Sequence, residues 1–149
     1  MAAIFSHAAE KSYFGYGDLH AMGGYPMVGV GFRAQDGIHA FDLSANACFL
    51  NPPYSLGVFH CRGLYLYYPA KQGPYFGAGL GLLNEPETMK KMSGSFEMAM
   101  GWQMNSRHRI KVFLEIDGIV PFQAAFSRGM LGVEKIARIW PGLTIGFGF

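Results

Sequence analysis

Apolar side chains occupy every second position over much of the chain. In the stretch 40–49, Phe41 and Leu43 alternate with Asp42 and Ser44. The same alternation recurs in 27–33, 75–82, 95–103, 109–117 and 142–149. A period of two places successive side chains on opposite faces of a β-strand, whereas a helix repeats about every 3.6 residues. The pattern predicts an all-β chain whose strands each have one apolar face.

The second face of these strands carries small, polar or charged side chains. Glycines recur on it, as at Gly77, Gly79 and Gly81, which is expected where strands curve around a narrow lumen. On a lipid-facing wall, Arg or Lys near mid-bilayer would cost about 2–4 kcal/mol. We therefore predict that the apolar face points to lipid and that a network of charged side chains fills the lumen. Its expected members are Arg33, Asp42, Arg62, Glu97, Lys111, Glu115 and Asp117.

Turn signals divide the chain at regular intervals, and the stretches between them are close to the ~9–11 residues that a tilted strand needs to cross a bilayer. The predicted strands are 26–35, 38–49, 56–68, 74–83, 93–104, 108–120 and 138–149. A closed antiparallel barrel in one bacterial chain has an even number of strands. We therefore predict an eighth strand at Lys11–Leu19, which pairs with the closing strand at Pro141–Phe149. The result is an eight-stranded antiparallel up-and-down transmembrane β-barrel.

This barrel is expected to span residues 11–149 as a single domain. Residues 1–10 are interpreted as an N-terminal tail or the remnant of an export signal, because Ser6-His7-Ala8 is similar to the end of a signal-cleavage site. The connections alternate in length: those near 36, 72 and 106 are short, and 50–55, 84–94 and 122–137 are longer. Short turns are typical of the periplasmic side and longer loops of the outside. We expect 122–137 to form a short amphipathic helix or a folded outer loop.

The turns also predict how neighbouring strands pair. An Asp36-Gly37 hairpin turn, for example, sets the register of the strands around it. The expected cross-strand pairs are Phe32 with Phe41, Asp42 with Arg62, Ser44 with His60, Tyr67 with Phe76, and Glu97 with Glu115. Aromatic residues near the strand ends are expected to form girdles at the membrane interfaces. They are Tyr65, Tyr67, Tyr68, Tyr75, Trp102 and Trp140.

The composition agrees with a membrane barrel. Half of the chain is apolar and 15% is charged, against about 25% in soluble domains. No apolar run reaches the ~18 residues of a membrane-spanning helix. The net charge of +2 comes without a basic stripe, so no nucleic-acid partner is expected. Two cysteines suit neither a disulfide framework nor a zinc site, and we predict no metal and no cofactor.

The lumen charges have three interpretations. The first is a network that fills a narrow barrel, and the second is a gated ion path or small-ligand site centred on Glu97 and Glu115 with Lys111 nearby. In the third, Ser44 and His60 belong to a hydrolase site, but no third group is placed to orient the histidine. We therefore predict no catalytic activity.

The chain's ending resembles the C-terminal signature of bacterial outer-membrane proteins. The signature consists of alternating hydrophobic residues and a terminal Phe, here Leu143, Ile145, Phe147 and Phe149. The resemblance implies that the barrel-assembly machinery reads these residues. The segments Tyr25–Asn46, Leu64–Tyr68, Tyr75–Gly81 and Trp140–Leu143 also resemble small barrel proteins of Chlamydia-like bacteria. This implies an outer-membrane location, with outer-membrane lipid as the surroundings, but no activity.

Together these features favour an outer-membrane barrel with a structural, adhesion or surface-interaction role. A narrow channel is the first alternative. The second is a soluble, calycin-like small-ligand binder, which would have an apolar interior.

Overall fold

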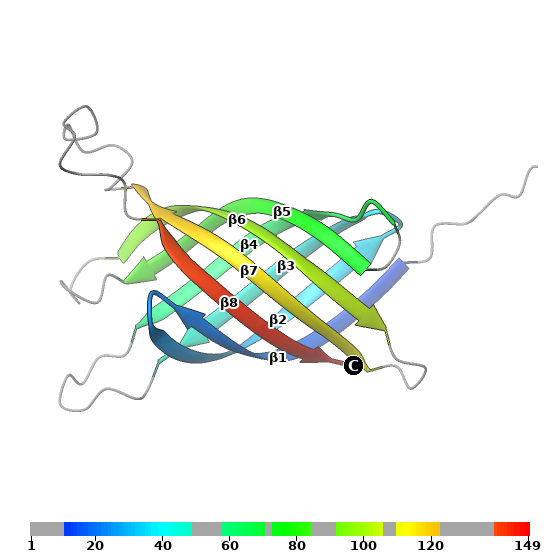
Figure 1. Cartoon of the computed structure of the whole chain (residues 1–149), viewed down its shortest axis with the longest axis horizontal. Coiled ribbons are helices and arrows are strands. Elements are labelled where there is room, and N and C mark those ends of the chain that lie inside the picture. The colour runs from blue at the N-terminus through cyan, green and yellow to red at the C-terminus, as the bar shows by residue number, and fades with distance from the viewer. Residues whose placement is uncertain (1–10, 49–57, 71–72, 85–91, 106–109, 123–138) are drawn as a thin grey trace, which may run out of the picture.

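The computed structural model describes residues 11–48, 58–70, 73–84, 92–105, 110–122 and 139–149. Within these ranges the chain forms eight strands in sequence order (Figure 1). They are β1 (Lys11–Met22), β2 (Tyr25–Asp36), β3 (His39–Ala47), β4 (Phe59–Tyr67), β5 (Gly73–Asn84), β6 (Met92–Asn105), β7 (Lys111–Pro121) and β8 (Trp140–Gly148). No helix in these ranges is long and apolar enough to cross a membrane.

Each strand pairs antiparallel with the next, and β8 pairs back onto β1 to close the barrel. The fold is therefore an all-β, eight-stranded antiparallel up-and-down barrel, as predicted. The N-terminal strand, inferred only because the count had to be even, is present and slightly longer than expected. It pairs with the closing strand from Tyr16–Gly148 to Met22–Gly142, which confirms that part of the prediction.

The strands are strongly staggered. Following cross-strand partners once around the barrel leads from Lys11 to Ala21, ten residues further along β1. With ~3.3 Å between residues and ~4.8 Å between strands, this stagger corresponds to a tilt of about 40° to the barrel axis. The inclined strands are visible in Figure 1. Because the stagger is even, a position that faces inward is joined only to positions that also face inward.

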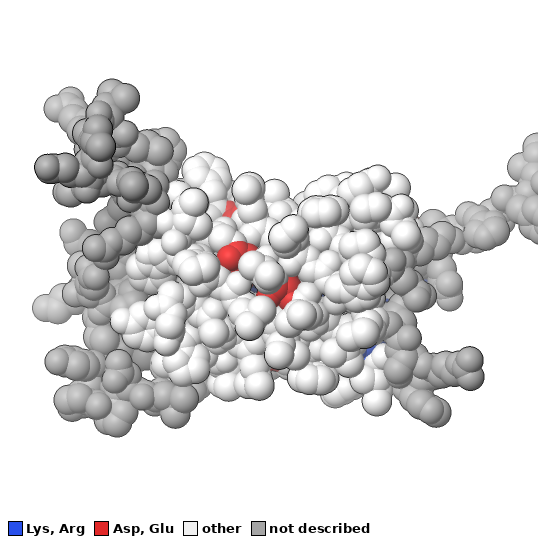
Figure 2. Space-filling model, viewed as in Figure 1, with Lys and Arg blue, Asp and Glu red and all other residues white. Residues whose placement is uncertain are grey.

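Alternation places one set of side chains outside and the other inside. The outside is apolar, and the face in Figure 2 is almost free of charged side chains. Large apolar residues remain exposed on all eight strands, among them Leu19, Val30, Leu43, Tyr65, Leu80, Met98, Ile116 and Leu143. The buried set includes Arg33, Asp42, Arg62 and Glu115. This distribution is the reverse of a water-soluble barrel with an apolar interior, so the calycin-like alternative does not fit.

The two ends of the barrel differ in their connections. At the loop end lie the β1–β2 turn and the connections 48–58, 85–91 and 122–139. The short-turn end holds the connections 37–38, 68–72 and 106–110, the start of β1 and the end of β8. The helix or folded loop expected within 122–137 falls almost entirely outside the described residues.

Several predicted registers are wrong by an even number of residues. Phe32 pairs with Leu43 instead of Phe41, because the hairpin turn is Gly37-Ile38, in which Gly37 adopts a positive φ of 63°. The β3–β4 register is also displaced by two residues, and the β6–β7 register by four. By contrast, Tyr67 pairs with Phe76 as predicted. Even displacements leave inward and outward positions unchanged, which is why the charged residues of these strands lie on the face predicted for them.

Two apolar clusters lie inside the barrel, one towards each end. The short-turn cluster is Phe14, Tyr16, Ala40, Leu64, Leu66, Tyr68, Tyr75, Ala99 and Phe113. The loop-end cluster is Met22, Met27, Cys48, Val58, Leu83 and Ile119, with Tyr25 and Trp140 packed against it. The buried polar residues of the middle strand positions lie between them.

Candidate functional site: a buried polar network in the lumen

Six of the seven charged residues predicted for the lumen are buried inside the barrel: Arg33, Asp42, Arg62, Glu97, Glu115 and Asp117. Lys111 is the exception. It begins β7 at the short-turn end, where its Nζ donates to Ser12 Oγ and lies 4.1 Å from the centre of the Phe14 ring. The structure therefore joins six of these residues and places the seventh at the rim.

Arg33 is the centre of the first group, which we call the arginine cluster: Tyr16, Arg33, Asp42, Tyr68 and Gln103. Arg33 and Asp42 face each other across β2 and β3, and Arg33 Nε donates to Asp42 Oδ2 over 2.7 Å. Arg33 Nη1 donates to Tyr68 OH and to Gln103 Oε1, both at 3.1 Å. Tyr16 OH donates to the second oxygen of Asp42 over 2.8 Å. The pair is thus held by neighbours from β1, from β6 and from the residue that follows β4.

Aromatic rings surround the Arg33 guanidinium. Its Cζ atom lies 4.4 Å from the centre of the Phe113 ring and 4.9 Å from that of Tyr75. A planar guanidinium is suited to stacking on ring faces while its N–H groups bind in the plane. Since a buried charge is costly unless it is both paired and hydrogen-bonded, these contacts explain how Arg33 can be fully buried.

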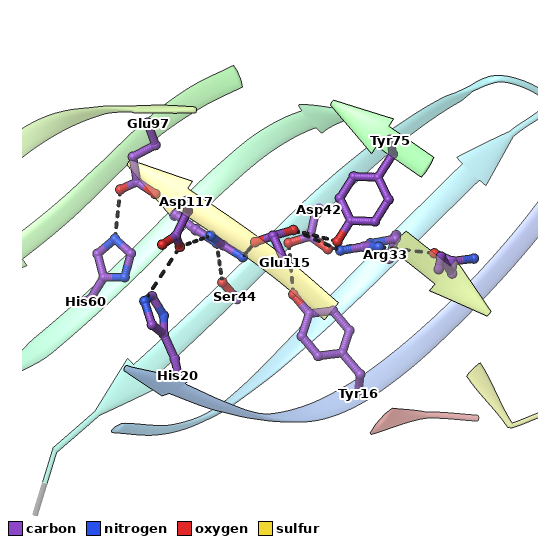
Figure 3. A network of polar contacts seen from close by, with 12 residues as sticks. Tyr16, His20, Arg33, Asp42, Ser44, His60, Tyr75, Glu97, Glu115 and Asp117 are labelled. Atoms are coloured by element: carbon purple, nitrogen blue, oxygen red, sulfur yellow. Dashed lines mark hydrogen bonds and ion pairs between the residues drawn. The ribbon is translucent and has the colours of Figure 1, made fainter. Parts of the chain in front are cut away.

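Arg62 lies nearer the loop end and joins three strands. Its Nε donates to Ser44 Oγ over 3.1 Å, its Nη1 to Asp117 Oδ2 over 2.8 Å, and its Nη2 to Glu115 Oε1. The other oxygen of Glu115 accepts from Tyr75 OH at 2.7 Å and lies 3.7 Å from Arg33 Nη2. Glu115 therefore connects Arg62 to the arginine cluster, as Figure 3 shows for Glu115, Tyr75 and Arg33.

Beyond Arg62, towards the loop end, lies a second group that we call the histidine cluster: His20, His60, Glu97 and Asp117. His60 Nε2 lies 2.7 Å from Glu97 Oε1, and His20 Nε2 lies 3.5 Å from Asp117 Oδ2 (Figure 3). The two imidazole rings meet edge to face, with their centres 5.7 Å apart. Four strands thus bring two histidines and two carboxylates together inside the barrel.

Glycines opposite the large interior side chains provide the room for them. A Cβ added to Gly31 would lie 2.1 Å from the Tyr16 ring, and one added to Gly146 would lie 2.1 Å from the Phe113 ring. Such distances are far below van der Waals contact, so these rings occupy space that only glycine leaves open. The recurrent interior glycines of the sequence are therefore part of the packing of the polar network.

Three predicted pairings in the lumen are wrong. Asp42 faces Leu64 and binds Arg33, so it is not paired with Arg62. Glu97 faces Ile119, and its carboxylate contacts His60; Glu115 lies instead between the two arginines. Ser44 faces Arg62 and accepts a hydrogen bond from it, so it is not paired with His60. The carboxylate pair and the serine–histidine pair proposed from sequence do not form.

The predicted aromatic girdles are correct in part. Trp102, Tyr65 and Tyr67 are exposed on the outer wall. Tyr68 and Tyr75 instead point inward and contribute hydroxyls to the network, because they fall at inward positions of β4 and β5. Trp140 is half-buried against the loop-end cluster.

Several network residues were not identified from the sequence: Tyr16, His20, Tyr68, Tyr75 and Gln103. Tyr16 and His20, which lie in β1, could have been identified from the alternation of the sequence. Alternation continued through Lys11–Met22 places Phe14, Tyr16, Asp18 and His20 on one face, and this face is buried.

Comparisons with known proteins agree with the fold. No protein-family model matches the chain, and no curated protein matches it. Among solved structures, the chain is similar to the N-terminal β-barrel domain of OprF from Pseudomonas aeruginosa, with a TM-score of 0.64 at 14% sequence identity. The similarity covers 94% of this chain and 100% of that one. Nothing in these comparisons points to Chlamydia-like bacteria, so that resemblance stays a prediction.

Proposed function

We propose that the chain is a bacterial outer-membrane barrel with a side-chain-filled lumen and a structural, adhesion or surface-interaction role. The observation that carries this proposal is the reversed distribution of polarity. Exposed apolar side chains cover the outer wall, whereas five carboxylates and two guanidiniums of the described residues are buried inside. Soluble proteins rarely expose large continuous apolar surfaces, so lipid is the environment in which this exterior is stable.

The closed sheet meets the requirement that a membrane imposes on the backbone. In hydrocarbon every N–H and C=O group must be satisfied within the protein, and a closed barrel does this because it has no free edge. The strands contain 9 to 14 residues, which meets the ~9–11 residues that a tilted strand needs to cross a bilayer. The similarity to another β-barrel domain adds support for the fold only.

A channel is less well supported than a filled barrel. Eight strands leave an interior just wide enough for side chains. Here the described interior holds an apolar cluster near each end, with the arginines and their partners between them. We expect no conductance above background in planar bilayers. Stable channel openings by the purified barrel would contradict the filled lumen.

The connections support the proposed orientation. Short turns lie at the end where β1 begins and β8 ends, and three of the four connections at the opposite end are longer. In outer-membrane barrels the short turns face the periplasm. A surface-contact role would therefore belong to the connections 48–58, 85–91 and 122–139.

The membrane location is tested by two matched lysine substitutions on the outer wall. Val30 lies near the middle of β2 and Tyr13 near the short-turn end of β1, and both are exposed. In lipid vesicles, Val30→Lys should lower the free energy of unfolding by about 2–4 kcal/mol and Tyr13→Lys by at most ~1 kcal/mol. Equal effects, or a wild-type chain that stays monomeric and soluble without detergent, would contradict the membrane proposal.

The closing strand supports a further part of this proposal, recognition by the barrel-assembly machinery. Leu143, Ile145 and Phe147 remain exposed on the outer wall, and Phe149 is 88% exposed at the end of the chain. We expect Phe149→Ala to reduce the amount of heat-modifiable barrel in cells while leaving refolding from urea into detergent unchanged. If both fall together, the residue acts in stability and not as a signal.

The surface role requires a separate experiment. Cells that display the wild-type barrel should be compared with cells displaying a variant whose 123–138 segment is replaced by a short Gly-Ser linker. Lower adherence at equal surface amounts would favour adhesion through that segment. Unchanged adherence combined with weaker resistance of the envelope to detergent when the whole barrel is absent would favour a structural role.

A further inference from the structure

The histidine cluster lies in a closed compartment of the lumen. On one side Arg62 contacts Asp117, and on the other side lies the loop-end apolar cluster. Both histidines and both carboxylates are almost fully buried; the most exposed of the four is Asp117, at 4%. Groups this deep require partners, because a buried polar atom without a hydrogen bond costs about 1–3 kcal/mol.

Many of the polar atoms here have no hydrogen-bond partner. Both ring nitrogens of His20 lack one, as do His60 Nδ1 and Glu97 Oε2. Asn46, which faces His60 across β3 and β4, is 1% exposed, and neither its amide nitrogen nor its amide oxygen is hydrogen-bonded. The same holds for Asp18 Oδ1, Asp117 Oδ1 and Thr144 Oγ1. Native structures rarely leave so many buried polar atoms in one place without a bound group.

The buried charges do not balance. Among the described residues, five carboxylates are buried against two guanidiniums, so with neutral histidines the interior carries three excess negative charges. Arg33 and Arg62 are engaged by Asp42, Glu115 and Asp117. The excess therefore falls mainly at the loop-end side, where Asp18 and Glu97 make no ion pair with either arginine. This is the environment that attracts a cation.

We propose that the histidine cluster binds a divalent transition-metal ion through His20, His60, Glu97 and Asp117. Imidazole and carboxylate are the ligands that zinc and copper share. Two imidazoles bound to one ion at ~2.0–2.1 Å place their ring centres ~5–6 Å apart, and the observed separation is 5.7 Å. As they stand, no three His, Cys, Asp or Glu side chains in the described ranges converge at metal-binding distance. Binding requires the rings to turn towards a common point.

Glycines line the barrel wall beside both carboxylates of the histidine cluster. A Cβ added to Gly142 would lie 1.6 Å from Asp117 Oδ1 and 2.8 Å from His20 Nε2. One added to Gly81 would lie 1.7 Å from Glu97 Oε1. These two glycines allow the carboxylates to lie flat against the wall beside the imidazoles. We call the space beside Gly81 and Gly142 the cradle of the proposed site. A methyl group placed in it should weaken metal binding without removing any ligand.

The test uses the full chain refolded in detergent, with its closed state checked by the heat-dependent shift on an SDS gel. A background variant with His7→Asn, His39→Asn and His108→Asn retains only the two interior histidines of the five in the sequence. We expect this variant to bind one equivalent of Zn²⁺ by calorimetry and to show nitrogen coupling from two imidazoles in the Cu²⁺ electron paramagnetic resonance spectrum. Mg²⁺ and Ca²⁺, which prefer all-oxygen sites, should not compete.

Removing either interior histidine from this background should weaken Zn²⁺ binding at least about ten-fold, the order that supporting contacts alone are worth in metal sites. His20→Asn and His60→Asn test the ligands, and Gly142→Ala tests the cradle with every ligand retained. Absence of one-to-one binding by the folded background variant would overturn the proposal, even if a histidine variant fails to fold. So would an affinity that is unchanged in folded His20→Asn and His60→Asn.

Discussion

The arginine cluster and the histidine cluster occupy the same lumen, at the same depth of burial, but they differ in how completely they are paired. Arg33 is fully buried and is bound by Asp42, Tyr68 and Gln103, with aromatic rings around it. His20 is equally buried, and neither of its ring nitrogens makes a hydrogen bond. In the first cluster Arg33 Nη2 alone lacks a hydrogen bond, and it lies 3.7 Å from Glu115 Oε2, whereas five buried polar atoms of the histidine cluster lack one.

This difference indicates that the two halves of the barrel have different roles. A polar network with its members satisfied rigidifies a core, whereas a partly satisfied one is destabilising unless something else binds there. The short-turn half, with its rings packed around Arg33, is therefore expected to carry stability. The loop-end half, nearer the proposed outer surface, is expected to carry ligand binding at some cost in stability. Substitutions at three places separate these roles: at Arg33, at the glycines beside each cluster, and at His60.

The largest effect is expected at Arg33. Arg33→Met removes the cation and leaves Asp42 buried without its partner, which should lower the free energy of unfolding by about 3–5 kcal/mol. Urea unfolding in lipid vesicles, followed by tryptophan fluorescence, measures this. The double variant Arg33→Met with Asp42→Asn should recover part of the loss, because no uncompensated charge then remains. A loss below ~1 kcal/mol in the single variant would mean that the arginine cluster does not hold the barrel together.

An intermediate effect is expected at the glycines beside each cluster. Gly146→Ala pushes a methyl group into the packed Phe113 ring and should cost about 1–3 kcal/mol. Gly142→Ala meets the ends of two side chains, Asp117 and His20, which can turn away more easily than a packed ring, so its cost in stability should be smaller. Gly17→Ala is the matched control, because a Cβ there meets nothing closer than 3.8 Å. If Gly142→Ala were the more damaging, the proposed contrast between the halves would be reversed.

The smallest effect on stability is expected at His60. Without metal, His60→Asn should change the free energy of unfolding by less than ~1 kcal/mol, because His60 Nδ1 is already without a hydrogen bond and Glu97 Oε1, which loses its contact with His60, still accepts from Ser95 Oγ. With saturating Zn²⁺, the wild type should gain stability by linkage and the variant should not. Unfolding curves with and without Zn²⁺, or with a chelator, decide this. An equal gain in both proteins would contradict a role for His60 as a ligand.

The fold could be predicted from the sequence because side chains alternate between the two faces of a strand. Inward and outward positions alternate strictly, so Arg33, Asp42 and Glu115 could be assigned to the lumen from their neighbours in the chain alone. An error of two or four residues in a turn leaves that assignment intact. In the proposed membrane setting, lipid also excludes charge from the outer wall, which would account for the charged residues of the clear strands all falling on one side.

The contacts within the lumen could not be predicted from the sequence in the same way. Which carboxylate meets which cation depends on the register of each pair of strands, and this depends on the length of turns whose sequences allow several choices. The β6–β7 register differs from the predicted one by four residues. Glu97 therefore does not face Glu115, and it contacts His60 instead. Contacts across the lumen, such as Arg62 with Glu115, join strands that are not neighbours, and no local pattern encodes them.

The pairing of β1 with β8 has a consequence for the time course of folding. Tyr16 and Gly148 are cross-strand partners although almost the whole barrel lies between them in the chain. Contacts between such distant residues form slowly, because a long loop must be ordered first. Until they form, the free edges of β1 and β8 can pair with other chains. Closure, and with it protection from aggregation, therefore comes only after β8 has been synthesised, so a helper that covers these edges would act once all eight strands are available.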